Sequence, residues 1–338
     1  MKKKNLQYLI YKNINKFFDI KNILPEYSNV YSHTDLNLRN INKELNLSYN
    51  NKSIKNTKKI KLKKLSANIY KNKIIETFKT ITSSKVKKHI KSIILHGSYA
   101  DNGFIKYWSD IDAILILEDK FFKEKHNIYY FKNILKKFFK KLLKFSPLQH
   151  HGLEILIYNS QSKMINFYSE IKILENSKLL YGVESIRFKT NFKTKNNSLK
   201  LIQTRKKYLK EALKTGCFRH HMMKNKSLNH PISKNINRMY QLATLINFIL
   251  NIPILYFSSI KRPINKKYSF SKFKQEISNE KILFVLDNCR KIRKNWKKKY
   301  LNKNLIPRYI FKYINKNFIY DCYIALNELE KIIKKKSF

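Results

Sequence analysis

The chain contains few cysteines, which can cross-link a fold, and few glycines and prolines, which form turns and end helices and strands. Among its 338 residues are 3 cysteines, 5 glycines and 6 prolines. The cysteines, at positions 217, 289 and 322, lie far apart and form no Cys-x-x-Cys pair. The sequence therefore indicates neither a disulfide framework nor a structural zinc site, and we expect a protein of the reducing cytoplasm.

Acidic residues are also scarce. The chain has 22 Asp and Glu against 72 Lys and Arg, which gives a formal net charge of +50. A field of this sign attracts polyanions such as RNA, DNA and nucleotides. The favoured residues Lys, Asn, Ile, Tyr and Phe are also those of A- and T-rich codons. The charge is therefore explained either by a polyanionic partner or by genome composition.

A long apolar run is missing as well. The most apolar segment, residues 242–257, contains Asn247, Asn251 and Pro253 and is shorter than the roughly 20 residues that cross a bilayer. The basic N-terminus leads into an apolar stretch that Lys12 interrupts, without the small-residue cleavage site of a secretory leader. We expect neither secretion nor membrane insertion, and we interpret residues 242–257 as a core helix that ends near the proline.

The residues that are present suffice for two packed domains. Hydrophobic residues make up 43% of the chain and aromatic residues 14%, which is typical of globular proteins. We expect a helical or loosely structured extension over residues 1–64, a mixed α/β domain over 65–185 and an all-helical domain over 186–338. The basic run 58–64 is interpreted as a solvated linker rather than a phosphate-binding arm.

Apolar residues at the spacing of a helix or a strand predict the regular elements of each region. The helices expected in the first half are 5–19, 69–81 and 121–145. The strands expected there are 92–95, 110–117 and 153–158. The helices expected in the C-terminal half are 196–214, 232–250, 270–287 and 307–335. The order helix, strand, strand, helix, strand between residues 65 and 185 is that of a small mixed α/β unit.

Two short motifs in this α/β unit carry the chemistry. Gly97-Ser98 follows the first strand, and eleven residues separate it from Asp110-Ile111-Asp112, which opens the second. Positions i and i+2 of a strand point to one side, so Asp110 and Asp112 are expected to present their carboxylates together. Such a pair favours divalent cations, with Mg²⁺ the first candidate and Mn²⁺ the second. If the strands are neighbours, the glycine turn and the Ser98 hydroxyl meet the acids and can bind nucleotide phosphates there.

These motifs resemble the signature of the nucleotidyltransferase superfamily, which includes DNA polymerase β, poly(A) polymerases and aminoglycoside nucleotidyltransferases. The signature is an apolar residue, then Gly-Gly or Gly-Ser, and after a short interval Asp, apolar, Asp or Glu, apolar. Ser109, directly before the first aspartate, also fits many members. One departure is that Tyr99-Ala100-Asp101 stands where many relatives carry a basic residue. The resemblance implies an α+β fold over residues 65–185, a mixed sheet with flanking helices, followed by the all-helical C-terminal domain.

The resemblance also implies a third carboxylate. In that superfamily it usually comes from a later strand, and it binds the catalytic metal or takes the proton of the incoming hydroxyl. Glu154 is the candidate here because it is the one acid in the apolar run 153–158, where an uncompensated charge is unfavourable. The alternative is an edge-strand glutamate that faces water.

Other polar residues are weaker candidates for substrate contacts. His150 and His151 directly precede the strand of Glu154, where they could line the cleft or simply stabilise a turn. Lys266 and Lys267 lie in a basic loop expected over residues 261–270. Because a helical domain often closes over the nucleotide in two-domain nucleotidyltransferases, these lysines could reach the triphosphate, or they could be ordinary loop residues.

Trp296 is the remaining candidate. It lies among the lysines of residues 290–300 and could stack on RNA, or it could be a buried indole on a solvated helix.

The expected activity is a Mg-dependent nucleotidyl transfer. An acceptor hydroxyl attacks the α-phosphate of a nucleoside triphosphate, and pyrophosphate leaves. A small molecule, a tRNA or other RNA, and a protein all stay open as acceptors, with the positive charge favouring RNA. The rival hypothesis is an inactive domain of the same fold that acts as a basic RNA-binding or scaffolding protein, and the intact acid pair counts against it.

Overall fold

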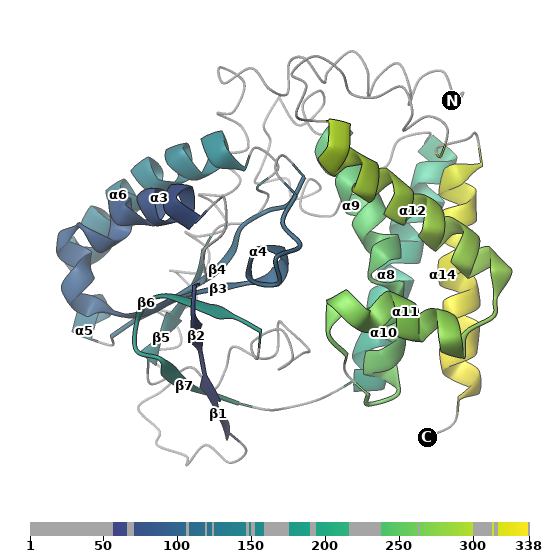
Figure 1. Cartoon of the computed structure of the whole chain (residues 1–338), viewed down its shortest axis with the longest axis horizontal. Helices are drawn as coiled ribbons and strands as arrows, with labels where there is room; N and C mark the ends of the chain where they lie inside the picture. Colours follow the sequence, from purple (N-terminus) through teal and green to yellow (C-terminus); the bar gives the residue numbers. More distant parts are fainter. Residues whose placement is uncertain are drawn as a thin grey trace. The chain divides into compact units, whose positions relative to one another are not determined.

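The computed structural model describes thirteen parts of the chain. They are residues 57–65, 71–105, 108–118, 120–123, 125–146, 149, 153–158, 176–189, 194–215, 238–262, 264–299, 313 and 317–336. These parts belong to two compact units, a sheet unit up to residue 189 and a helical unit from residue 194 onward (Figure 1). The helix expected over 5–19 lies outside the described residues.

The sheet unit is built on a mixed five-stranded sheet. Its strands, in spatial order, are β2 (Lys63–Lys64), β6 (Lys178–Gly182), β3 (Ile90–His96), β4 (Asp112–Leu117) and β5 (Glu154–Ile157). β3 runs antiparallel to both of its neighbours, whereas β2 is parallel to β6 and β5 is parallel to β4. β3 and β4 are buried along nearly their whole length, which is why each reads as a continuous apolar run rather than as an alternation.

Helices cover one face of this sheet. They are α3 (Lys71–Thr82), α5 (Lys120–Lys123) and α6 (Lys125–Phe145). Ile93, Leu95 and Leu115 point into this layer, where they form the main core with Phe78 of α3 and Phe138 of α6. α3 and α6 lie side by side over the sheet in Figure 1. Residues at alternate positions of the strands therefore face the opposite side of the sheet.

A two-stranded ribbon packs against that opposite face. It consists of β1 (Thr57–Lys61) and β7 (Ser185–Lys189), which are antiparallel. Ile60 and Ile186 of the ribbon form a second, smaller core with Ile94, Ile114 and Ile116 of the sheet. We call the side of the sheet that carries Ile94, Ile114 and Ile116 the ribbon face.

The linker interpretation of residues 58–64 is wrong, because these residues contribute to β1 and β2. Ile60 and Leu62 are only 5% and 3% exposed, whereas Lys59 and Lys61 are exposed. The segment thus alternates with a period of two, as a half-buried strand does. The high lysine content conceals this pattern when the sequence is judged by its charge.

Strands β6 and β7 are not predicted from the sequence either. β6 lies between β2 and β3, and β7 follows it after a short turn. Gly182 ends β6 with a φ of 92°, and a Cβ atom there would lie 2.0 Å from the carbonyl oxygen of Lys91. Only glycine allows the backbone to approach β3 this closely in that conformation.

Every regular element that the structure describes from residue 194 onward is a helix. The helices are α8 (Thr194–Thr215), α9 (Arg238–Leu250), α10 (Ile252–Ser259), α11 (Lys266–Glu276), α12 (Glu280–Lys299) and α14 (Phe318–Lys335). α14 packs against α8 and α12 (Figure 1). None of the described helices is long and apolar enough to cross a membrane. The expected mixed sheet with flanking helices, followed by a helical region, is confirmed.

One helix boundary differs from the expectation. The single helix expected over 270–287 is wrong, because α11 ends at Glu276 and the Oδ1 atom of Asn279 accepts a hydrogen bond from Ile282 N at the start of α12. This N-cap begins a new helix although the apolar spacing continues. The helix end expected near Pro253 is confirmed, since α9 ends at Leu250; the apolar segment then continues as a second helix, α10, with Pro253 in its first turn, where proline is tolerated.

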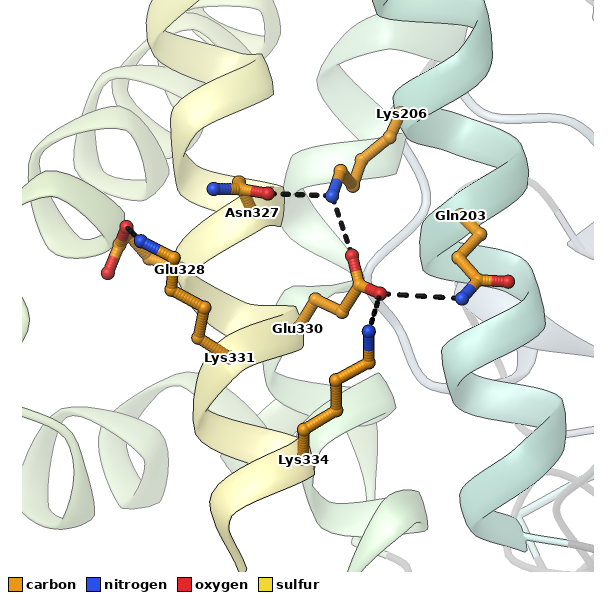
Figure 2. A network of polar contacts seen from close by, with 7 residues as sticks. All are labelled: Gln203, Lys206, Asn327, Glu328, Glu330, Lys331 and Lys334. Atoms are coloured by element: carbon orange, nitrogen blue, oxygen red, sulfur yellow. Dashed lines mark hydrogen bonds and ion pairs between the residues drawn. The ribbon is translucent and has the colours of Figure 1, made fainter.

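A polar network joins α14 to α8. The Glu330 carboxylate accepts hydrogen bonds from Lys206 (2.6 Å), Lys334 (2.7 Å) and Gln203 (3.4 Å), and Lys206 also donates to Asn327 (2.7 Å), as Figure 2 shows. Burial alone would raise the pKa of Glu330. The hydrogen bonds from Lys206, Lys334 and Gln203, with the charge of Lys206, outweigh it and hold the pKa at about 2.

The network predicts a specific loss of stability in acid. The pKa of Glu330 is lower in the folded protein than in the unfolded chain, so its contribution is complete above the unfolded pKa of 4.5 and disappears as the pH falls toward 2. We expect Glu330→Gln to lower the free energy of unfolding by roughly 3 kcal/mol at neutral pH. Urea unfolding at a series of pH values should show the difference between the two proteins shrinking below pH 4.

Glu328→Gln is the matched control on the same helix. Glu328 is half-buried and pairs with the exposed Lys331 of the same helix (Figure 2), at 2.9 Å. An ion pair with a solvent-exposed partner contributes about 1 kcal/mol or less. Equal effects of the two substitutions at neutral pH would contradict the role assigned to the buried network.

Candidate active site

The Gly-Ser motif lies at the end of β3, where the chain enters the short helix α4 (Gly97–Ala100). Gly97 has a φ of 66°, in the left-handed region that favours glycine. A Cβ atom at this position would lie 2.1 Å from Oδ2 of Asp112. Because β3 and β4 pair with His96 opposite Asp112, the two halves of the motif meet at one end of the sheet.

The Ser98 hydroxyl is unusual among the polar groups of this turn. Its Oγ atom is buried and has no hydrogen-bond partner within the described part of the chain. Leaving a buried hydroxyl unsatisfied is unfavourable by about 1–3 kcal/mol. A phosphate oxygen at this position would accept its hydrogen bond, so the turn fits an anionic ligand.

The two aspartates occupy different local structures. Asp112 is the first residue of β4, half-buried, and lies on the ribbon face with Ile114 and Ile116. The expectation that Asp110 shares this strand is wrong, because β4 begins only at Asp112. Before β4 begins, the peptide groups of Ile111 form hydrogen bonds with the side-chain amide of Gln149 instead of with a neighbouring strand.

Glu154 begins β5, the edge strand next to β4. It pairs in register with Ile114, which puts it on the ribbon face together with Asp112 but further along the sheet. Its side chain is half-buried, and its Oε2 atom is buried. Over the residues that the structure describes, no three His, Cys, Asp or Glu side chains are grouped as a metal site. The structure thus brings Glu154 to the face of Asp112 without forming a three-carboxylate cluster.

The remaining predicted residues lie elsewhere. Lys266 and Lys267 are exposed and belong to the helical unit, in the first turn of α11 rather than in a loop. Asn265 caps this helix, since its Oδ1 atom accepts a hydrogen bond from Lys267 N at 2.8 Å. His150 and His151 are outside the described residues, and so is the side chain of Trp296.

The sequence does not predict the polar residues after α6 that hold the backbone on either side of Asp110. Gln149 is only 1% exposed, and its amide accepts from Ile111 N at 2.8 Å and donates to Ile111 O at 3.1 Å. Ser146 Oγ donates to Ser109 O at 2.8 Å, and Ser109 Oγ accepts from Ile105 N at 3.0 Å. The one signal in the sequence is that serine and glutamine follow the apolar end of α6, and such residues are also common in ordinary turns.

Comparison with known proteins identifies the region that contains this geometry. Residues 75–179 match the sequence model of a family described as nucleotidyltransferase domain. The match includes Gly97, Ser98, Asp110, Asp112 and Glu154 and ends within β6. A search of curated proteins finds no match. The resemblance drawn from the two motifs is confirmed by the family match.

Proposed function

We propose that this chain, whose residues 75–179 form a nucleotidyltransferase domain, transfers a nucleoside monophosphate from a nucleoside triphosphate to an acceptor hydroxyl and releases pyrophosphate. The observation that carries the proposal is the close approach of Gly97 to the Asp112 carboxylate, with the buried Oγ of Ser98 beside it in the same turn. A phosphate-binding turn and an acid that meet in this way provide the two halves of a phosphoryl-transfer site.

The turn after β3 binds the triphosphate. Gly97 has no side chain, so the Asp112 carboxylate can lie directly against the backbone of the turn. Ser98 donates its hydroxyl to a phosphate oxygen, which satisfies a group that is otherwise buried without a partner among the described residues. Fixed donors of this kind orient the α-phosphate for attack without reorganising during the reaction.

The acids provide the negative side of the site. Asp110 and Asp112 would hold Mg²⁺ or Mn²⁺, because carboxylate oxygens are the ligands that these hard cations prefer. When bound, the metal supplies Lewis-acid stabilisation of the charge that develops on the phosphate and on pyrophosphate. Glu154, on the same face of the sheet, serves as a third ligand or takes the proton of the acceptor hydroxyl.

The acceptor is a small molecule, an RNA such as tRNA, or a protein. The net charge of +50 favours RNA, because phosphate groups are attracted to a basic surface. Lys266 and Lys267, exposed at the start of α11, are the proposed contacts of the helical unit with the triphosphate. The chain would act in the cytoplasm, in keeping with its few, widely spaced cysteines.

The acceptor class is tested by label transfer. The purified full chain is incubated with each α-labelled nucleoside triphosphate, Mg²⁺ or Mn²⁺, and separate pools of tRNA, total protein and small metabolites. We expect the unchanged chain to transfer label to one of the pools. We expect the Asp110→Ala and Asp112→Ala variants to transfer label to none of them. Nucleotide binding without transfer to any pool, unaffected by both substitutions, would instead support the inactive scaffold.

A further inference from the structure

We propose that Gln149, with the help of Ser146, is a positioning residue that fixes the relative orientation of Asp110 and Asp112. This inference rests on the proposed function, because it assigns these residues to the same site. Gln149 lies after the end of α6, 38 positions from Ile111, the residue between the two acids. The contact is therefore a tertiary one, between the segment that follows α6 and the residue before β4.

The Gln149 amide binds both peptide groups of Ile111. Its Oε1 atom accepts from Ile111 N at 2.8 Å, and its Nε2 atom donates to Ile111 O at 3.1 Å. Among the side chains, only the amides of Gln and Asn offer one uncharged donor and one acceptor in this planar arrangement. Gln149 thus imitates a neighbouring strand at the residue before β4 begins.

Burial makes this contact rigid. Gln149 and Ile111 are each 1% exposed, and the Ile111 side chain is part of the main core under α3 and α6. If a buried amide loses its partners, its donor and its acceptor are both left unsatisfied away from water, which is unfavourable. Neither hydrogen bond is therefore easily broken. The peptide plane and the side chain of Ile111 are therefore fixed at the same time.

A second hydrogen bond fixes the chain on the other side of Asp110. Ser146, fully buried at the end of α6, donates from Oγ to the carbonyl oxygen of Ser109 at 2.8 Å. The backbone is thus held immediately before Asp110 and immediately after it, while the Asp110 residue itself is only half-buried. Asp112 follows directly, at the first position of β4.

This support matters because two neighbouring carboxylates repel each other. Without it, the segment before β4 could turn Asp110 away from Asp112, and a cation would have to restore the arrangement on binding. Because the backbone is already held in place before a cation binds, the two acids do not have to be rearranged during binding or reaction. Displacements of about 1 Å at such a site reduce rates by about 10²-fold.

Gln149→Met tests the proposal, because methionine keeps the length of the side chain and removes both hydrogen bonds. We expect the Mn²⁺ concentration for half-saturation, measured by water proton relaxation of the full chain, to rise about 10- to 100-fold. In the transfer assay kcat should fall about 10²-fold, while KM for the nucleotide changes less than about 3-fold. Gln203→Met, the same substitution in the Glu330 network, should leave both measurements unchanged.

The Mn²⁺ titration separates this inference from the proposed function. If the unchanged chain binds Mn²⁺ through Asp112 but transfers no nucleotide to any pool, the proposed function fails, and weaker Mn²⁺ binding by Gln149→Met still supports the positioning role. Should Gln149→Met fail to fold, Ser146→Ala replaces it, with an expected rise of about 3-fold in half-saturating Mn²⁺. A folded Gln149→Met, or failing that a folded Ser146→Ala, with unchanged Mn²⁺ affinity and kcat would overturn the proposal.

Discussion

Asp112→Ala is expected to reduce nucleotidyl transfer by at least about 10³-fold, because it removes the acid that faces the phosphate-binding turn. Its Oδ2 atom lies against the backbone of Gly97, 2.1 Å from the position that a Cβ atom would take there. Without this carboxylate, the site has no anion there to hold a cation against the triphosphate. Pyrophosphate release by equal amounts of folded protein, with thermal unfolding as a check on the fold, measures the effect.

Two further variants separate charge from shape and from general destabilisation. Asp112→Asn keeps the shape of the side chain but not its charge, so it should lose nearly as much activity as Asp112→Ala. Glu184→Gln removes an acid from the turn between β6 and β7, where Glu184 forms an exposed ion pair with Lys64 at 3.4 Å. It should leave transfer unchanged. Retention of more than about a tenth of the activity by Asp112→Ala would contradict the assigned role.

Gly97→Ala is expected to reduce transfer by at least about 10²-fold, with only a modest change in stability. The added Cβ would lie 2.1 Å from Oδ2 and 3.0 Å from Cγ of Asp112, so the carboxylate must move away from the turn. The left-handed backbone at a φ of 66° adds about 1 kcal/mol of strain for alanine. Initial rates of transfer and the midpoint of urea unfolding report the two effects separately.

Gly103→Ala is the matched control a few residues away. A Cβ atom at Gly103 would meet only the carbonyl oxygen of Ser98, at 3.7 Å, which is an ordinary van der Waals contact. Its backbone is outside the left-handed region that disfavours alanine. We expect this variant to keep its activity within about 2-fold. Equal losses in the two variants would show that the turn tolerates no alanine at all, and that the contact with Asp112 is not the cause.

The sequence correctly predicts that the glycine turn meets Asp112, but it does not predict the local structure at Asp110. Gly97-Ser98 and the two aspartates are recognisable because their chemistry depends on a short interval between two apolar strands. The conformation at Asp110 depends instead on Gln149, whose amide replaces a strand partner for Ile111. A hydrogen bond between residues 38 positions apart leaves no periodic signal in the sequence.

The errors in the fold have similar physical causes. Ile60 and Leu62 alternate with lysines whose charge dominates the composition of the segment, so β1 and β2 resemble a linker. In the helical unit, Phe273, Ile277 and Ile282 are buried on both sides of a break, and their spacing resembles one continuous helix. There the Asn279 cap, a single side-chain hydrogen bond, determines where the chain turns.

Nucleotidyl transfer is distinguished from other phosphoryl transfers by nucleoside triphosphates labelled at the α- or the γ-phosphate. With Mg²⁺ and the acceptor pool that the chain modifies, we expect the α label to appear on the acceptor and the γ label to leave as pyrophosphate. Both signals should disappear in Asp112→Ala and persist in Glu184→Gln. Transfer of the γ label to the acceptor, or α-label transfer that survives Asp112→Ala, would show that the chain is not a nucleotidyltransferase that depends on Asp112.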